Sequence, residues 1–451
     1  MGNTQSPPVD PLFASASRAF TQKEIGDLRA LFVSMAAQSQ SDGRYISPSV
    51  FQAYFGLKGA LGERLFDLVT QQRKDRKLTF EDLVIAKGTY EKGTNDEIEE
   101  FVYQLSDITG DGALGSYDSN HLIYIAFGVV VSFKVTAIFA VNSNMSAIES
   151  VLVMIFDDIF NVKSSEPGSS SRGDMVDIFL NAATFSRGDE RCNDKSMSFE
   201  DFRKWCTLIP SLRKFLGSLL IPPDSGRPGS QVPKLLHLEN IDSSILLLRK
   251  EYAWHIGGAL SQQELVEWKL LYHSTLNGLS FNTFLGSITN DNGPTVLIIK
   301  DNEGYIYGGY ASQPWERHSD FYGDMKSFLF QLHPKASIFR PTGANNNLQW
   351  CAVSFSSEAI PNGIGFGGRV NHFGLFLSAG FDQGHTFSCT TFNSPCLSKN
   401  SKICPEVIEC WGVVRKGKQE ERQDALKGTV LERFKEDRNM LNMVGIANAS
   451  E

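Results

Sequence analysis

Residues 107–118 place oxygen-bearing side chains at the spacing of a calcium-binding loop. The stretch reads DITGDGALGSYD, with acidic or hydroxyl side chains at positions 1, 3 and 5 and Gly112 at position 6, where such a loop turns sharply. Asp118 at position 12 is shorter than the usual Glu, so it reaches an ion less easily in bidentate fashion. The stretch predicts either a weak calcium site or a loop that keeps its turn without an ion. The candidate ligands are Asp107, Thr109, Asp111, Ala113 and Asp118.

A second stretch, residues 363–376, reads GIGFGGRVNHFGLF and contains the spacing G-x-G-x-x-G. A dinucleotide site would need a strand before these glycines, a helix opening at the last one and a carboxylate about 20 residues later. The residues after Gly368 instead read as a strand interrupted by Gly374. We therefore expect these glycines to let the backbone bend or let strands approach closely, without any role in nucleotide binding.

The N-terminal sequence MGNTQS fits the signal for N-myristoylation, which would place an acyl chain on Gly2 once Met1 is removed. A chance match is the alternative. A single myristoyl chain binds membranes marginally and reversibly, and no second anchoring signal is visible, because residues 1–20 contain one cation and the first cysteine is Cys192. The sequence therefore predicts a protein that visits membranes and needs a protein partner to stay there.

The other reactive side chains show no catalytic arrangement. The histidines are scattered and form no H-E-x-x-H pair, and neither a G-x-S-x-G elbow nor a Walker loop occurs. Cys389 or Cys396 could react with oxidants, but no cationic neighbour or resolving cysteine favours this chemistry. A structural role for the thiols is preferred, and we expect no enzymatic activity.

The chain of 451 residues carries a formal net charge of −8 and is 41% hydrophobic, which allows about three domains with real cores. The negative charge and the absence of a basic run argue against nucleic acid as a partner. Residues 122–141 are apolar enough to span a bilayer, yet Lys134 lies inside them, so a buried helix is the preferred interpretation.

The first half of the chain has the pattern of helices joined by short loops. Two capping boxes, Thr21–Glu24 and Thr94–Glu97, precede apolar residues at helical spacing. The tracts 77–83 and 196–202 have the form of the back half of an EF-hand loop and the start of its exit helix. Their front halves carry arginines or lack the turn glycine, so we expect these loops, and a similar one near residue 40, to be structural.

Two polar stretches look like connections. Residues 163–174 are expected to be a mobile loop, and residues 222–233 are expected to be a linker between the helical half and a β-rich half. After it, Ser261 and Glu264 predict a capping box for a helix that would run on to Tyr272. Residues 295–311 then read as a hairpin with its turn at residues 301–304. Further strands are expected at 337–340, 348–355, 373–379 and 407–414, which favours two packed antiparallel sheets.

Several spaced motifs of the second half, taken in order, resemble the TLDc domain. They span about residues 240–415 and are W-x-x-L-Y-x-S from Trp268, GPTVLIIKD from Gly293, GYIYGGY from Gly304, FLF from Phe328, IGFGG from Ile364 and ECWGV from Glu409. The resemblance implies a β-sandwich that binds protein and brings no agreed set of catalytic residues. The layout of the whole chain is similar to that of an animal TLDc protein with a degenerate EF-hand-like domain and a helical tail.

Residues 419–445 are rich in charged helix formers and carry an apolar stripe at helical spacing. Two interpretations remain open: the stripe folds back onto the protein's own core, or it docks as an amphipathic helix in a groove of a partner. In a TLDc protein of this layout, the implied partner is the catalytic head of the vacuolar-type proton-pumping ATPase. The residues of the stripe are Leu426, Val430, Phe434 and Leu441.

The expected fold class is α+β and multidomain. The expected units are a flexible N-terminus with the lipidation site (1–20), an all-α EF-hand-like domain (21–221), a linker (222–233), a TLDc β-sandwich with flanking helices (234–415) and a C-terminal helix (419–445). The resemblance implies a non-enzymatic adaptor that binds subunits of the vacuolar-type ATPase through TLDc and the tail, located in the cytoplasm and peripherally at vacuolar or lysosomal membranes. The alternative is a calcium-responsive scaffold, in growth or oxidative-stress signalling, that works through the EF-hand-like domain.

Overall fold

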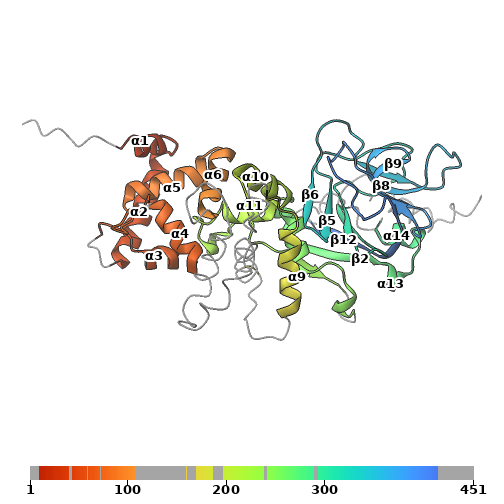
Figure 1. Ribbon diagram of the computed structural model, residues 1–451, viewed down its shortest axis with the longest axis horizontal. Coiled ribbons are helices and arrows are strands. Elements are labelled where there is room, and N and C mark those ends of the chain that lie inside the picture. Colours follow the sequence, from red (N-terminus) through yellow and green to blue (C-terminus); the bar gives the residue numbers. More distant parts are fainter. Residues whose placement is uncertain are drawn as a thin grey trace, which may run out of the picture.

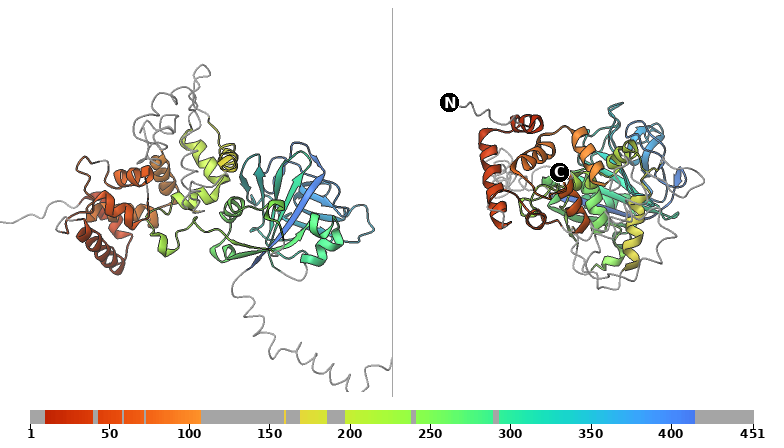
Figure 2. Two further views of the ribbon diagram at one scale, coloured as in Figure 1. Left: turned by 90° about the horizontal axis from the view of Figure 1, so that it is seen from below. Right: turned by 60° about the vertical axis from the view of Figure 1, so that its left-hand side comes forward.

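The computed structural model describes residues 10–39, 43–57, 59–71, 73–106, 159, 169–185, 197–237, 241–288 and 293–414. Helices occupy the N-terminal part and two sheets occupy the C-terminal part, which confirms the predicted α+β fold class. The molecule is elongated, with the first helices at one end and both sheets at the other (Figure 1; Figure 2). Within the described residues, no helix is both long and apolar enough to cross a membrane, and the apolar segment 122–141 lies outside them.

Nine helices are described in the N-terminal part of the chain. They are α1 (Pro11–Arg18), α2 (Gln22–Gln38), α3 (Pro48–Tyr54), α4 (Gly59–Val69), α5 (Phe80–Lys92), α6 (Asn95–Ser106), α9 (Ser169–Leu180), α10 (Phe199–Leu208) and α11 (Pro210–Leu216). The two predicted capping boxes are confirmed, at Thr21–Glu24 before α2 and at Thr94–Glu97 before α6. Each box satisfies two N–H groups that the helix itself leaves unpaired, which is why these helices begin where they do.

Helices α2 to α5 form two helix–loop–helix units that are joined between their loops. Ile46, between α2 and α3, and Leu78, between α4 and α5, exchange backbone hydrogen bonds of 2.9 and 3.2 Å in a short antiparallel bridge. Both side chains are fully buried. Arg76 precedes this bridge with a left-handed backbone (φ +49°), at the place where the second loop turns.

The structure differs from two expectations in this part. Residues 11–18, within the segment expected to be flexible, form α1, which starts at a proline and is capped by the Asp10 carboxylate on the N–H of Leu12 at 2.8 Å. Residues 169–174, in the expected mobile loop 163–174, belong to α9. In the second case the buried apolar residues Met175, Val176 and Phe179 follow directly, so packing of the helix outweighs the weak helix propensity of the serines.

Residues 222–233, expected to be a linker, are packed against the helices. Arg227 is buried, and its guanidinium donates hydrogen bonds to the carbonyls of Phe55 and Ile221. Gly229 has φ +81°, and a Cβ there would lie 2.4 Å from the backbone nitrogen of Phe215. The composition of this stretch indicates a spacer, but its contacts fix it in place, because one buried cation and one close backbone approach hold it against α11.

The C-terminal part contains two sheets. The first has the strand order β1–β2–β12–β3–β4–β5–β6, and β1 and β2 are parallel while its other pairs are antiparallel. Its strands are β1 (Lys234–Leu236), β2 (Glu267–His273), β3 (Thr295–Asp301), β4 (Ile306–Ala311), β5 (Phe328–His333), β6 (Ser337–Phe339) and β12 (Pro405–Val414). The second, antiparallel sheet is formed by β7 (Gln349–Ala352), β8 (Gly363–Arg369), β9 (His372–Ser378), β10 (Gly384–His385) and β11 (Lys402–Ile403).

The predicted hairpin at 295–311 and the four further strands are confirmed, whereas the helix predicted after Ser261 is wrong. The capping box of Ser261 with Glu264 forms, but it opens only a short 3-10 helix, η3 (Gln262–Leu265). The chain then enters β2, which lies between β1 and β12. The apolar spacing from Leu265 to Tyr272 fits a helix equally well, so the pairing with β12, more than a hundred residues away, decides the outcome.

The first sheet is the middle of three layers. On β3, Val296 and Ile298 face the helices, while Leu297 and Ile299 face the second sheet. This explains why the run from Val296 to Ile299 is apolar throughout, since both of its faces are buried. The helix-facing core includes α12 (Lys250–Gly257) and continues without interruption into the N-terminal helices. Two further helices, α13 (Ser274–Asn277) and α14 (Phe281–Ile288), flank the side of the two packed sheets.

Candidate functional site

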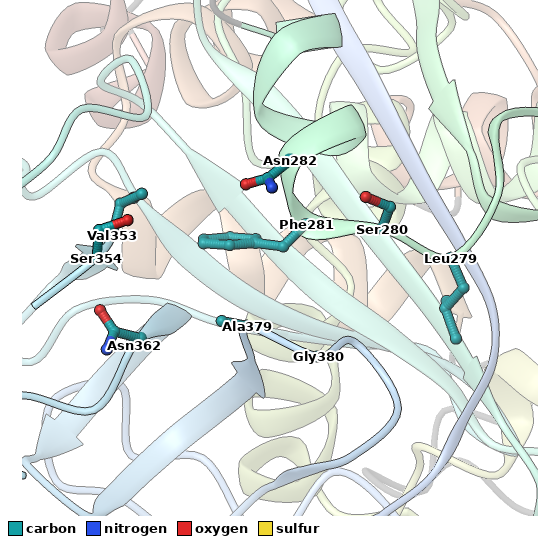
Figure 3. A pocket seen from close by; sticks show the side chains of 9 residues that line it. All are labelled: Leu279, Ser280, Phe281, Asn282, Val353, Ser354, Asn362, Ala379 and Gly380. Atoms are coloured by element: carbon teal, nitrogen blue, oxygen red, sulfur yellow. The ribbon is translucent and has the colours of Figure 1, made fainter.

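An open pocket of about 460 Å³ lies where the segment between α13 and α14 meets the ends of three strands of the second sheet (Figure 3). The strand ends are those that follow β7, precede β8 and follow β9. The end of β7, the start of β8 and the end of β9 lie at the same end of the sheet because neighbouring strands are antiparallel. The lining residues are Leu279, Ser280, Phe281, Asn282, Val353, Ser354, Asn362, Ala379 and Gly380.

The helical wall of the pocket is shaped by a tight connection. Tyr272, at the end of β2, donates its hydroxyl proton to the carbonyl of Gly278 at 2.6 Å, and Gly278 has φ +81°. The side-chain oxygen of Asn277 accepts a hydrogen bond from the N–H of His273 at 2.9 Å. This left-handed turn, which glycine adopts without steric cost, directs the chain from α13 into α14 and leaves Leu279 at the rim.

The strand wall is fixed by one asparagine. The carboxamide of Asn362 accepts from the N–H of Phe355 at 2.9 Å and donates to the carbonyl of the same residue at 2.8 Å. The backbone carbonyl of Asn362 accepts a hydrogen bond from the N–H of Ala379 at 2.9 Å, which links the β7–β8 connection to the end of β9. Ser354 lies in the same connection with φ +55°. These hydrogen bonds pre-organise the wall, so a ligand would not have to order it on binding.

Buried aromatic rings join the two walls. Phe381 is fully buried in the turn after β9, and its ring centroid lies 5.3 Å from that of Phe281 and 5.1 Å from that of Phe284. The ring centroids of Phe284 and Tyr272 are 5.3 Å apart. In Figure 3 the ring of Phe281 extends from the start of α14 toward Val353 and Ser354. Packing of this kind makes the position of α14 depend on the β9–β10 turn.

The side chains that line the pocket are suited to binding a ligand through hydrogen bonds and apolar contacts. Among its described lining residues none is acidic, basic or a thiol, so the available groups are hydroxyls, carboxamides and apolar surface. Beside it, Leu276 and Leu279 leave 49% and 45% of their surface exposed to solvent. An uncharged polar pocket flanked by two exposed leucines is suited to binding a segment of a protein partner. The two leucines would lose their contact with water when the partner binds.

A titratable pair at the end of β2, His273 with Glu409 of β12, is buried and structural. Glu409 is fully buried and accepts hydrogen bonds from the N–H groups of Leu247 and Leu248 and from the indole of Trp411 at 2.9 Å. Burial raises the pKa of the Glu409 carboxyl above its ordinary value, and these hydrogen bonds together with His273, 3.5 Å away, oppose the rise. The ECWG motif therefore anchors the segment before α12 instead of presenting a reactive acid.

The glycine-rich stretch is a hairpin. Residues 363–376 form most of β8 and β9, which pair from Gly363 with Ser378 to Arg369 with His372. Gly367 and Gly368 have φ +66° and +82°, and a Cβ on Gly367 would lie 2.7 Å from the ring of Phe392. The prediction that these glycines serve backbone bending and close approach is confirmed.

None of the site residues predicted from the sequence lies within the described residues. Gly2, the candidate calcium ligands within 107–118 and the apolar stripe at residues 426–441 all lie outside them. Among the residues that the structure does describe, no cluster of three or more histidines, cysteines or carboxylates could hold a metal ion.

Sequence reasoning did not single out the pocket residues. The available signals were turn dipeptides, Asn277-Gly278, Asn362-Gly363 and Ala379-Gly380, each of which marks the end of a helix or strand. Which of these ends meet in space depends on strand order, and no local pattern specifies it.

Residues 241–414 match the TLDc domain family, and this part of the chain contains the pocket and every strand of both sheets except β1. The resemblance seen in the spaced motifs is thereby confirmed for this part of the chain.

Curated relatives extend the similarity beyond the domain. The chain is 31% identical to the MTOR-associated protein MEAK7 of Mus musculus over 303 residues, which are 64% of this chain and 65% of the mouse protein. It is 33% identical to the protein of the same name from Danio rerio, over 53% of this chain and 54% of the relative. Oxidation resistance protein 1 of Bos taurus is 31% identical over 32% of this chain and 16% of its own length. The chain therefore spans less than two thirds of the length of these relatives.

Proposed function

We propose that the protein is a non-enzymatic adaptor that binds the vacuolar-type proton-pumping ATPase through its TLDc domain and its C-terminal segment, 419–445, at vacuolar or lysosomal membranes. The relatives support the coarser part of this proposal. They include proteins named for association with MTOR and for oxidation resistance, which are descriptions of regulatory and stress-related proteins. The pump as partner is the finer step and follows from the TLDc resemblance.

One observation carries the choice of a binding function. The pocket at the strand ends has an uncharged lining among its described residues and lies beside the exposed leucines Leu276 and Leu279. Apolar side chains that stay half exposed beside a pre-organised polar wall are typical of the centre of a protein interface. Thiol chemistry is disfavoured, because burial raises the pKa of Cys396 and raises that of Cys351 to about 12, so both remain protonated at neutral pH.

Affinity purification of the tagged full chain, scored for rotary ATPase subunits, tests the proposal. The double variant Leu276→Asp with Leu279→Asp should reduce recovery of the subunits about tenfold or more, since truncating or charging a central contact costs about 2 kcal/mol. Val370→Asp is the matched control, because Val370 is also an exposed apolar residue (37%) but lies in the β8–β9 turn. Unchanged recovery by the leucine variant would remove the pocket from the interface, and absence of ATPase subunits from the wild-type sample would overturn the proposal.

Calcium control is the second candidate function. We infer that α2 to α5 are an EF-hand-like pair, and two observations support this: the backbone bridge between Ile46 and Leu78, and the left-handed turn at Arg76. In the second loop Arg73 and Asp82, positions 3 and 12 of a twelve-residue loop, form an ion pair, so an internal cation stands where calcium would bind. Calcium binding would then rest on residues 107–118. Purification with and without Ca²⁺ separates the two functions, because partners recovered only with Ca²⁺ would favour the scaffold.

Membrane association is proposed to begin with a myristoyl chain on Gly2, which gives weak and reversible binding until a partner is engaged. Partitioning of wild-type protein and Gly2→Ala between membrane and soluble fractions checks this step. Equal partitioning of the two proteins would exclude a role of acylation.

A further inference from the structure

A second cavity, of about 240 Å³, lies where helix α11 of the helical part meets the end of α12 in the C-terminal part. We refer to it as the junction pocket. Its lining includes Ser211 and Lys214 of α11, Trp254 of α12, and Leu260 and Leu265, which follow that helix. Lys214 is the one charged side chain among its described lining residues. The pocket is therefore small and mostly apolar, with a single cation in its wall.

Two glycines bring the walls of the junction pocket together. A Cβ on Gly258 would lie 2.3 Å from the backbone nitrogen of Ser211, so α11 and the end of α12 meet backbone to backbone. A Cβ on Gly257 would lie 2.7 Å from Cδ2 of Leu265, which forms the neighbouring wall. Walls that are held by such close contacts are already in place before a ligand binds.

Two cations lie beside the pocket at successive carbonyl groups. The Nζ atom of Lys214 donates to the carbonyl of Leu260 at 3.0 Å, and Arg340, directly after β6, donates from Nη2 to the carbonyl of Ala259 at 3.1 Å. Within the described part of the chain, neither cation forms an ion pair with a carboxylate. Carbonyl groups that follow a helix attract cations, but they carry only partial negative charge.

The positive charge at this place is energetically costly for the protein. Burial lowers the pKa of Lys214, and the nearby charge of Arg340 lowers it further. Burial also lowers the pKa of Arg340. Glu264, the acid of η3, is directed elsewhere, since the hydroxyls of Ser261 and Tyr310 donate to its carboxylate at 2.8 Å. An anion between the two cations would relieve their repulsion.

The junction pocket also contains a buried hydroxyl that makes no hydrogen bond to the described residues. Ser211 is only 1% exposed, and its Oγ atom has no partner among them. A buried hydroxyl without a partner costs free energy, so its presence in the wall of a cavity indicates a polar group of a ligand. Lys214 and Arg340 can contribute too, because each uses one N–H in the contacts above and keeps others.

We propose that the junction pocket binds a small phosphate monoester, with the phosphate between Lys214 and Arg340 and the organic part against Leu260 and Leu265. A phosphate dianion matches two cations, whereas a carboxylate matches one, and its oxygens accept several hydrogen bonds, including one from the hydroxyl of Ser211. The cavity is smaller than a typical drug-sized site, so the organic part is small.

A ligand in this position would connect two parts of the molecule. Lys214 belongs to the helical part, and Arg340 follows a strand of the first sheet. The bound phosphate would replace a repulsion between these parts with two attractions, so it would stabilise their junction. This inference does not depend on the ATPase as a partner.

Isothermal titration calorimetry of the full chain tests the site, with phenyl phosphate as the probe. Phenyl phosphate should bind about tenfold more tightly than inorganic phosphate, which lacks the apolar part, and than benzoate, which carries a single charge. Lys214→Gln and Arg340→Gln should each weaken binding of phenyl phosphate about tenfold. Lys335→Gln is the matched control, because Lys335 is an exposed cation in the turn before β6, and it should leave binding unchanged.

Ser211→Ala separates a binding role from a structural one. Alanine removes a buried hydroxyl that lacks a described partner, so the unfolding temperature without ligand should stay the same or rise. Binding of phenyl phosphate should nevertheless weaken several-fold. A lower unfolding temperature without ligand would show that the hydroxyl supports the fold and would remove it from the site.

No saturable heat with millimolar phenyl phosphate would overturn the proposal, as would equal affinity of the wild type and the two glutamine variants. Benzoate that binds as tightly as phenyl phosphate would overturn the choice of a phosphate. Sedimentation with vesicles that contain phosphatidylinositol 4-phosphate identifies the source of the monoester. Vesicle binding that phenyl phosphate displaces would assign the site to a lipid headgroup, and no vesicle binding would assign it to a soluble compound; both results support a phosphate monoester site.

Discussion

Arg73, in the loop between α4 and α5, forms an ion pair with Asp82 in the first turn of α5. The side chain of Asp82 is only 5% exposed. Its carboxylate accepts a hydrogen bond from Arg73 and two from Thr79, whose N–H and hydroxyl both donate at 2.8 Å. A buried carboxylate is stable only when its lone pairs are satisfied, so the arginine neutralises the charge and the capping threonine completes the set. The ion pair therefore fixes the α4–α5 loop to the first turn of α5.

Removal of this arginine should destabilise the helical part. In Arg73→Ala the Asp82 carboxylate loses its charged partner while it stays buried, so the free energy of unfolding should fall by about 1–2 kcal/mol. This value is smaller than that expected for a fully buried pair because the side chain of Arg73 is 41% exposed. Urea denaturation followed by circular dichroism measures the change. The control is Lys74→Ala, an exposed neighbour, which should have no measurable effect. Equal stability of the two variants would mean that water satisfies Asp82.

At the scale of elements, glycines set how closely the two sheets and their loops approach. Gly309 of β4 faces Phe366 of β8, and a Cβ at Gly309 would lie 2.6 Å from that ring. Gly367 combines a left-handed backbone with close contact to Phe392. Substitution at such positions forces either backbone strain or movement of an aromatic ring in a packed core.

Gly367→Ala and Gly286→Ala should change stability in opposite directions. At Gly367 the alanine requires a left-handed backbone and overlaps Phe392, so the free energy of unfolding should fall by about 2–4 kcal/mol. At Gly286, inside α14, no atom of the described residues lies within 4 Å of a new Cβ, so alanine should stabilise the protein by about 0.5–1 kcal/mol through helix propensity. Thermal unfolding of both variants tests this, and a stabilising Gly367→Ala would contradict the role of the hairpin glycine.

At the scale of the whole molecule, one core joins the helices to the first sheet. His255 of α12 is fully buried in this junction, and its ring packs edge-on against Phe179 of α9 at 5.4 Å. Burial lowers the pKa of His255 to about 3, and the backbone of Ser337 in β6 opposes this only in part. The contact between the helical part and the TLDc domain therefore contains a group that must stay neutral.

The stability of the molecule should depend on pH through His255. Because its folded pKa is lowered, the neutral ring stabilises the fold fully above pH 6.5, and this contribution is lost as pH falls toward 3. The expected loss is about 2 kcal/mol between pH 7 and pH 5, since the unfolded state takes up the proton first. Denaturation of wild type and His255→Phe at pH 7, 6 and 5 measures it. The free energy of unfolding of His255→Phe should depend less steeply on pH than that of the wild type, and the control His318→Gln should show the wild-type dependence. Identical pH dependence in all three proteins would exclude His255 as its cause.

The sequence by itself determined the features that depend on near neighbours. The capping boxes at Thr21 and Thr94, the hairpin around residues 301–304 and the backbone role of the glycines in residues 363–376 follow from side chains a few positions apart, so local patterns were enough to predict them. The family resemblance was visible for the same reason, since its motifs are short runs kept in order.

Only the tertiary structure decided the features that depend on distant partners. Residues 267–273 are a strand because β12 pairs with them, residues 222–233 are fixed because Arg227 reaches Phe55, and the pocket exists because three strand ends and α14 meet around Phe381. In each case the local pattern allows more than one conformation of similar energy. The contacts that choose between them come from residues far away in the chain, and they form only when the sheets and helices pack together.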